Sequence, residues 1–175
     1  MVEVDQPATL AEKRQRLLDC GAELPGNCCW LDLDMATDDL AARLERAGCS
    51  LDQPTWFSCL GVTPYLSEES VWQTLTIVAS LPAGSGIVFD YRVTSRLLDP
   101  IEQAMERVTA EMFAKMGEPW RAHFGPAELV AGLNDLGFAR VRDMTAQDLN
   151  RRYFARRKDG LQSAGGGFRY IVAEC

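Results

Sequence analysis

Residues 55–70 read TWFSCLGVTPYLSEES, and this stretch decides the fold class. Residues 55–60 form a short, mostly apolar segment, which is typical of a strand buried on both faces of a parallel sheet. Gly61 and Pro64 then mark a loop. Ser67 and the two acids after it are typical of the first turn of a helix, because carboxylates stabilise helix amino termini. A strand, a loop and a helix in this order form one repeating unit of an α/β protein.

The same alternation runs along the whole chain. By apolar periodicity we expect strands at 1–4, 28–33, 87–91, 138–143 and 168–173, and helices at 8–20, 38–47, 67–80, after 100, at 126–136 and at 146–154. Gly21 and Pro25-Gly26 end the first helix. The sequence therefore predicts an α/β fold with a doubly wound, mostly parallel sheet. The last two strands are expected to pair antiparallel at one edge, within a single domain over residues 1–175.

One helix carries a long apolar stripe. After Asp99-Pro100, apolar residues recur at spacings of four, three, four and four, at Ile101, Met105, Val108, Met112 and Met116. This period is typical of one buried helix face. We therefore expect these side chains, methionines included, to fill the core.

Composition and charge narrow the classes of partner. The chain has 175 residues, 47% of them apolar, and a net charge of −7, which indicates a globular protein without a basic face for nucleic acid. No apolar stretch reaches the ~20 residues that span a bilayer, and the amino terminus lacks the apolar core of a signal peptide. We expect a cytoplasmic protein that binds neither nucleic acid nor membrane. The basic cluster at 151–158 is interpreted as a solvated helix face.

The cysteines and acids do not predict a metal site. Six cysteines are present without a C-x-x-C pair, and His123 is the single histidine. We expect the cysteines to act mostly as small buried hydrophobes. Two acid-x-acid pairs occur, at 3–5 and 32–34, but a hard cation needs more ligands than one such pair offers.

Ligands of open parallel sheets bind outside the carboxyl ends of the strands. That rule selects Glu3 and Asp5, then Asp32 and Asp34 with Met35, then residues 60–65, then residues 90–92. Asp5 or Glu3 suits the two hydroxyls of a ribose, because a carboxylate offers paired acceptors, and Asp34 suits an adenine amine. The alternative is that these acids cap helices or turns.

Other catalytic motifs are missing. The sequence has no G-x-G-x-x-G, and the glycines at 165–167 precede a strand and so do not form a phosphate loop. His123 is interpreted as a surface or capping residue, so no nucleophile with a base is predicted. A reaction that needs mainly positioning fits this pattern, and methyl transfer from a sulfonium is such a reaction.

Several stretches resemble the leucine carboxyl methyltransferase-like family of class I S-adenosylmethionine-dependent methyltransferases. They are EVDQP at 3–7, LGVTPYLSEE at 60–69, LPAGS at 81–85, VFDY at 88–91, GEPW at 117–120 and DGL at 159–161. The resemblance implies a Rossmann-like methyltransferase fold and the cofactor S-adenosylmethionine. It implies methyl transfer to a carboxyl or hydroxyl oxygen of a small molecule or a protein. Asp5 and Asp34 then hold ribose and adenine, and Met35 and Leu60 lie at the cofactor.

The chain departs from the family pattern in two ways. Leu60 stands where the family often has a glutamate. The chain also begins at the family's second strand, so we expect it to be truncated at the amino terminus, without the first strand and its glycine-rich loop. Strands flanking that gap would have unpaired edges, which favours self-association. The alternative function is a non-catalytic relic or a partner-dependent interaction domain that has lost cofactor binding.

Overall fold

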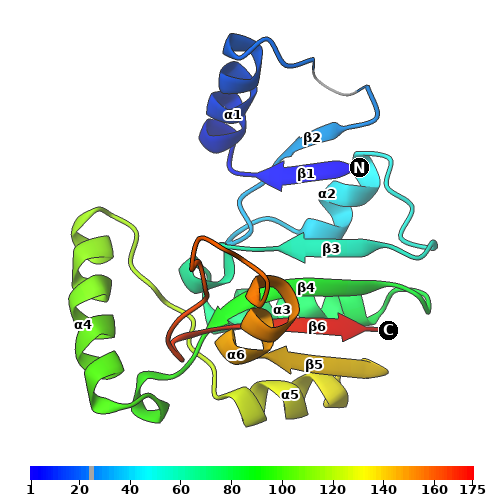
Figure 1. Ribbon diagram of the computed structural model, residues 1–175. Coiled ribbons are helices and arrows are strands. Elements are labelled where there is room, and N and C mark those ends of the chain that lie inside the picture. The colour runs from blue at the N-terminus through cyan, green and yellow to red at the C-terminus, as the bar shows by residue number, and fades with distance from the viewer. Residues whose placement is uncertain (24–25) are drawn as a thin grey trace. The chain divides into compact units, whose positions relative to one another are not determined.

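Strands and helices alternate along the chain in the predicted order (Figure 1). The computed structural model describes residues 1–23 and 26–175, so Pro25 of the predicted break after the first helix lies outside the described residues. Contacts between residues divide the chain into two units, Met1–Asp52 and Gln53–Cys175, and each is described by itself. The expectation of a single domain stays a prediction.

Unit 1 (Met1–Asp52) is a small parallel β-α-β motif followed by a helix. Strand β1 (Val2–Asp5) pairs in parallel with β2 (Cys29–Asp32), and Asp5 lies opposite Asp32. Helix α1 (Pro7–Asp19) connects the two strands, and α2 (Leu40–Arg46) follows. Its buried apolar side chains are Leu10, Leu33, Leu40 and Leu44. The parallel register places the carboxyl ends of β1 and β2 at the same edge of this sheet.

Unit 2 (Gln53–Cys175) contains a four-stranded sheet in the order β3-β4-β6-β5. The strands are β3 (Trp56–Cys59), β4 (Gly86–Arg92), β5 (Arg140–Met144) and β6 (Phe168–Glu174). β3 and β4 are parallel, and β6 is antiparallel to both of its neighbours. This arrangement confirms the α/β class and the antiparallel pairing of the last two strands. The reversed strand β6 lies one place in from the edge, which β5 forms.

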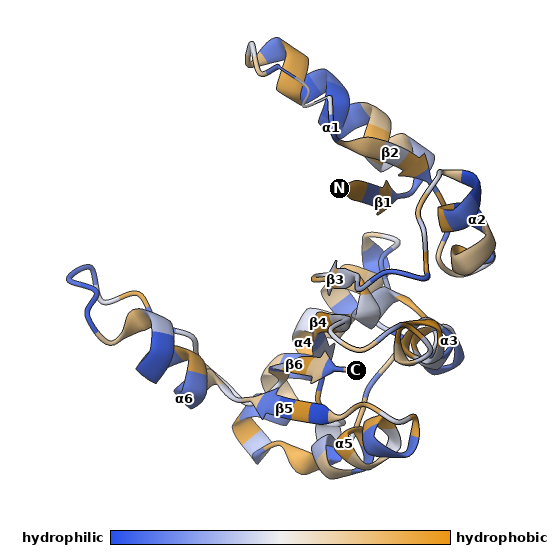
Figure 2. Ribbon diagram, turned by 90° about the vertical axis from the view of Figure 1, so that its right-hand side faces the viewer, coloured by the Kyte–Doolittle hydropathy of each residue, from blue (hydrophilic) through white to orange (hydrophobic). Residues whose placement is uncertain are grey.

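The helices of unit 2 flank the sheet at its faces and at the end of its strands (Figure 1, Figure 2). They are α3 (Glu68–Ala79), α4 (Pro100–Lys115), α5 (Pro126–Asp135) and α6 (Ala146–Leu149), which a π-helix (Asn150–Phe154) continues. Figure 2 shows α3 and α5 on one side of the strands and α6 on the other. Trp72 of α3 packs so closely on α5 that a Cβ at Gly132 would come within 2.5 Å of the indole. The core of the unit therefore lies between β4, β6 and the pair α3 and α5.

Strand β3 is less buried than its sequence predicted. None of its residues is fully buried, and Trp56 is exposed. The physical reason is its position, because β3 is the edge strand of the four-stranded sheet. The prediction of a strand buried on both faces was therefore wrong for the residues that the structure describes.

Helix α4 also corrects a prediction. Its apolar stripe is open to solvent, with exposed fractions between 51% and 74% at Ile101, Met105, Val108, Met112 and Met116. The helix lies at the end of the strands and does not lie across a face of the sheet, so the described part of unit 2 does not cover the stripe (Figure 1). Periodicity identified a real apolar face but could not tell whether anything packs against it.

The cysteines give a further correction. Cys20 is exposed and the other five thiols are half-buried, so the expectation of mostly buried cysteines was wrong. They lie on short strands, in loops and at element ends, where side chains are covered only in part. Arg151, Arg152, Arg156, Arg157 and Lys158 are exposed, as expected of a solvated face.

Candidate functional site

The loop after β3 is fastened to the end of β4 by Asp90. The backbone N–H of Gly61 donates to Asp90 Oδ1 at 2.7 Å, and the hydroxyl of Thr63 donates to the carbonyl of Asp90. Gly61 has φ +72°, a conformation that favours glycine. Burial raises the pKa of Asp90, although the hydrogen bond from Gly61 opposes that rise. These contacts therefore fix the loop at residues 61–65, which belongs to the stretch that resembles the family, at the carboxyl ends of two parallel strands.

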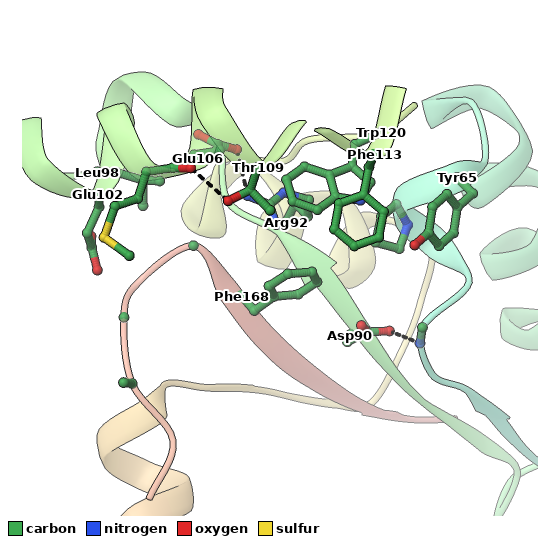
Figure 3. Close-up of a pocket in the computed structure, with 16 residues that line it drawn as sticks. Tyr65, Asp90, Arg92, Leu98, Glu102, Glu106, Thr109, Phe113, Trp120 and Phe168 are labelled. Carbon is green, nitrogen blue, oxygen red and sulfur yellow. Dashed lines mark hydrogen bonds and ion pairs between the residues drawn. The ribbon is translucent and has the colours of Figure 1, made fainter. Parts of the chain in front are cut away.

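A pocket of about 590 Å³ opens beside this loop, at the carboxyl ends of β3 and β4. Its walls are mostly apolar and aromatic, and Figure 3 shows the side chains that face it. The lining comes from Gly61, Pro64, Tyr65, Asp90, Arg92, Leu98, Glu102, Met105, Glu106, Thr109, Phe113, Trp120, Ala164, Gly165, Gly167 and Phe168. A concave apolar site with a few converging polar groups is the usual form of a small-molecule pocket.

Arg92, the last residue of β4, is enclosed by aromatic rings. Its guanidinium carbon lies 3.6 Å from the ring centroid of Trp120 and 4.6 Å from that of Phe168. Trp120 is itself tilted against Phe113, with centroids 5.1 Å apart. Figure 3 shows these rings gathered around Arg92. Such cation–π contacts fix the guanidinium in a desolvated position.

Glu106 of α4 neutralises Arg92. Its Oε1 accepts from Arg92 Nη2 at 2.9 Å, and both side chains are more than nine-tenths buried. Burial opposes ionisation of Glu106, but hydrogen bonds from Arg92 and Ser95 and the charge of Arg92 outweigh it and hold the pKa of Glu106 below its ordinary value. Arg92 Nε and Glu106 Oε2 are buried and have no hydrogen-bond partner among the described residues.

His123 lies next to this pair. Its Nε2 is 3.5 Å from Glu106 Oε1, and its side chain is half-buried. From the sequence we interpreted His123 as a surface or capping residue, whereas the structure places it next to the buried carboxylate of Glu106. The partner of His123 comes from a helix, so nothing in the local sequence indicated the contact.

One row of α4 faces the pocket, and it shares with the apolar stripe only the neighbouring Met105. Glu102, Glu106, Thr109 and Phe113 recur at spacings of four, three and four and line the pocket, with Met105 beside them. The row mixes charged, polar and aromatic residues, so a search for apolar periodicity passes over it. Glu102 also accepts from the backbone N–H of Gly166 at 2.5 Å, which holds the glycine segment 165–167 at the pocket.

The loop before β6 is closed by a single amide side chain. Asn150 Nδ2 donates to the carbonyl of Ser163, and the N–H of Ser163 donates back to Asn150 Oδ1, both at 2.8 Å. This paired contact fixes the point at which the chain returns toward the glycines of the pocket. Residues 155–163 between these anchors contain no helix or strand.

Asp5 and Asp34, the predicted cofactor carboxylates, lie in unit 1 at the carboxyl ends of β1 and β2. Asp5 Oδ1 accepts from the N–H of Gln6 at 2.8 Å, and Asp34 Oδ1 accepts from the N–H of Ala36 at 2.9 Å. Both carboxylates thus make the turn contacts of the alternative interpretation. Each also keeps a second oxygen without a hydrogen bond in the described part of the chain, so the structure does not choose between the two roles.

Met35 and Leu60 complete the predicted cofactor residues. Met35 is half-buried in the turn after β2. Leu60 lies in unit 2 between β3 and Gly61, and its side chain is exposed. In the part of the chain that the structure describes, no group of three or more His, Cys, Asp or Glu side chains could hold a metal ion. No helix in residues 1–23 and 26–175 has the length and apolar character that crossing a bilayer requires.

The fold is that of class I methyltransferases. A DUF574 family protein from Streptomyces avermitilis superimposes with a TM-score of 0.66 at 20% identity, over 99% of this chain and 64% of that chain. A Thermobifida fusca structure, provisionally called a methyltransferase, gives 0.64 at 22% identity, over 99% and 62%. The Rossmann-like methyltransferase fold that the sequence suggested is therefore confirmed.

The family resemblance is confirmed as well. Residues 1–79 match the family model described as leucine carboxyl methyltransferase. The chain is 32% identical over 174 residues to YktD of Bacillus subtilis, which is provisionally named an S-adenosyl-L-methionine-dependent methyltransferase. That match covers 98% of this chain and 56% of YktD. The chain thus spans about half the length of the curated relatives it matches.

Proposed function

We propose that this chain is part of an S-adenosylmethionine-dependent methyltransferase that methylates an oxygen atom, and that the pocket of unit 2 binds the methyl acceptor. The observation that carries the proposal is the pocket itself, which lies at the carboxyl ends of β3 and β4. Ligands of open α/β sheets bind at that edge. The name of YktD and the family match support the same reaction class.

The residues present fit the cofactor. Asp5 and Asp34 each keep a carboxylate oxygen that suits a ribose hydroxyl or an adenine amine. We propose Met35 and Leu60 as further cofactor contacts from their places after β2 and β3. When bound, S-adenosylmethionine supplies a methyl group already activated by a positively charged sulfur, so the protein needs no nucleophile of its own.

The chain's own residues then have three tasks. Phe113, Trp120 and Phe168 exclude water from the acceptor. The hydrogen bonds from Gly61 and Thr63 to Asp90 hold the 60–65 loop. The ion pair of Arg92 and Glu106 orients the polar group of the acceptor. Positioning of this kind can supply much of the rate of a displacement at carbon.

The test is a transfer assay with a radiolabelled methyl group. A chain extended at its amino end to the length of YktD is incubated with labelled S-adenosylmethionine and a panel of hydroxyl, carboxyl, amine and thiol acceptors. Labelled methyl ether or ester is the expected product, and loss of label in Phe168→Ser places the acceptor in the pocket. Label on nitrogen or sulfur acceptors alone would contradict O-methylation.

The non-catalytic alternative has its own supporting observation, the exposed apolar stripe of α4. Large exposed apolar surfaces commonly mark contacts with another protein. Absence of both cofactor binding and transfer in the extended chain, with a folded structure by circular dichroism, would favour that alternative.

A further inference from the structure

The polar groups of the pocket discriminate between acceptor oxygens. Its lining contains three carboxylates, those of Asp90, Glu102 and Glu106, and one guanidinium, that of Arg92. Glu106 already neutralises Arg92 at 2.9 Å, and two aromatic rings cover the guanidinium. An incoming carboxylate would therefore meet three carboxylates and no free cation among the described lining residues, which is unfavourable.

The two unpartnered atoms point to a different group. Arg92 Nε carries a hydrogen-bond donor, and Glu106 Oε2 is an acceptor. Both atoms are shielded from solvent, belong to residues that line the pocket and have no partner among the described residues. A hydroxyl can accept from one and donate to the other. A carboxylate could satisfy the donor but would place its negative charge against Glu106 Oε2. Leaving such groups unpaired is costly, so a ligand that pairs both gains affinity.

The aromatic walls of the pocket favour a flat ligand. Phe113, Trp120 and Phe168 contribute aromatic faces and edges, and Tyr65 lies at the other end of the group (Figure 3). Trp120 and Phe168 meet edge-to-face with centroids 6.4 Å apart. Flat rings pack well against such walls, since stacked and edge-to-face contacts are the favoured aromatic geometries.

We infer that the acceptor of this pocket is an uncharged aromatic hydroxyl compound, a phenol in chemical class, whose hydroxyl pairs with the Arg92–Glu106 ion pair. The inference rests on the proposed function for the pocket's role as acceptor site. It narrows that function, because it selects a hydroxyl over the carboxylate that the family name describes.

The test measures binding, so it does not depend on methyl transfer. 2-Naphthol and 2-naphthoate are matched in ring size, and each is titrated into the 175-residue protein at pH 7.5 by calorimetry and ligand-observed NMR. We expect 2-naphthol to bind at least tenfold more tightly. Equal affinity, or tighter binding of 2-naphthoate, would overturn the inference.

Two variants locate the preference. Glu106→Gln should reduce the ratio of the two affinities toward one, because the amide no longer repels a carboxylate. Glu111→Gln, on the same helix but exposed and outside the lining, should leave the ratio unchanged. If Glu106→Gln does not fold, Phe168→Ser keeps the ion pair and should weaken naphthol binding about tenfold by removing one wall. An unchanged affinity in Phe168→Ser would overturn the proposed location.

The two proposals fail separately. Tighter binding of 2-naphthol without transfer to any acceptor in the extended chain would contradict the proposed function and the acceptor role, and would leave only the preference of the pocket for a neutral hydroxyl ligand. Transfer confined to carboxylates would support the function and overturn the inference.

Discussion

The two units of the chain differ in how much core each contains. Of the 21 buried apolar side chains among the described residues, four lie in unit 1 and the other 17 in unit 2. Unit 1 has a two-stranded sheet and unit 2 a four-stranded one. Isolated two-stranded sheets are marginally stable, whereas three or more strands with packed helices hold together. The proposed acceptor pocket thus lies in the better supported unit, and the proposed carboxylates for ribose and adenine lie in the weaker one.

Thiol chemistry should give the largest contrast between the units. Cys20 of unit 1 is exposed, whereas burial and the charge of Asp90 raise the pKa of the Cys59 thiol in unit 2 to about 12. Only the thiolate reacts, so at pH 7.5 we expect iodoacetamide to modify Cys59 roughly a thousandfold more slowly than an ordinary thiol. Mass spectrometry of timed samples measures this, and denaturation in urea should equalise the rates. Fast labelling of Cys59 in the folded protein would remove the contrast.

Matched leucines test whether the units unfold separately. Leu75 in unit 2 and Leu10 in unit 1 are both 1% exposed. We expect Leu75→Ala to lower the free energy of unfolding of unit 2 by about 2–5 kcal/mol. Leu10→Ala should remove protection in residues 1–52 alone. Hydrogen exchange followed by mass spectrometry resolves both segments. Equal losses in both units from either change would indicate one cooperative domain over residues 1–175.

Cofactor binding should depend on unit 1. In a chain extended at its amino end, Asp5→Ala and Asp34→Ala should each weaken binding about tenfold to a hundredfold, through loss of a charge-assisted hydrogen bond. Glu45→Ala, exposed on α2, is the control in calorimetric titrations. Unchanged affinity in both aspartate variants would favour their role as turn caps.

Acid should weaken unit 2 through Glu106. Its pKa is lower in the folded protein, so the folded state binds that proton less readily than the unfolded chain does. The stabilisation is therefore complete above the unfolded pKa and is lost as pH falls through the folded pKa. Asp90 acts in the opposite direction, because its folded pKa is raised. Urea unfolding between pH 3 and 7 should show that the free energy of unfolding declines toward acid. This decline should persist in Asp90→Asn and be smaller in Glu106→Gln.

Self-association is the smallest effect that we expect. The edge strand β3 and the exposed stripe of α4 are both suited to contact a second chain. Sedimentation at rising concentration should show a weak monomer–oligomer equilibrium. The double variant Val108→Glu with Met112→Glu should abolish the association if the apolar stripe of α4 is responsible. The association should persist in this variant if the edge of β3 is responsible. A monomer at every concentration would contradict the expectation.

Local sequence predicted the elements well, because each depends on nearby residues. The strand and helix order, the antiparallel pairing at the carboxyl end and the acids at the ends of β1 and β2 all follow from periodicity and strand direction. The strand-end rule also selected residues 90–92, and Asp90 and Arg92 line the pocket. What it could not supply was the set of long-range partners of Arg92.

Those partners explain most of what was missed. Glu106, Trp120 and Phe168 meet Arg92 from three separate segments, and none belongs to a motif that carries chemistry by itself. The opposite error occurred on α4, where periodicity predicted burial for side chains that lie in solvent. Amphipathic patterning reports which face is apolar, but burial depends on whether another element covers that face.

The closure at Asn150 and Ser163 has an evolutionary consequence. The side chain of Asn150 both donates to and accepts from the backbone of Ser163, so the segment between these two residues forms a closed loop that ends before the glycines at 165–167. Lengthening such a loop costs little, since closure entropy grows only slowly with the number of residues. Insertions and deletions between 155 and 162 should therefore leave the pocket wall after residue 163 in place, so relatives can vary the length of this segment without rebuilding the interior of the pocket.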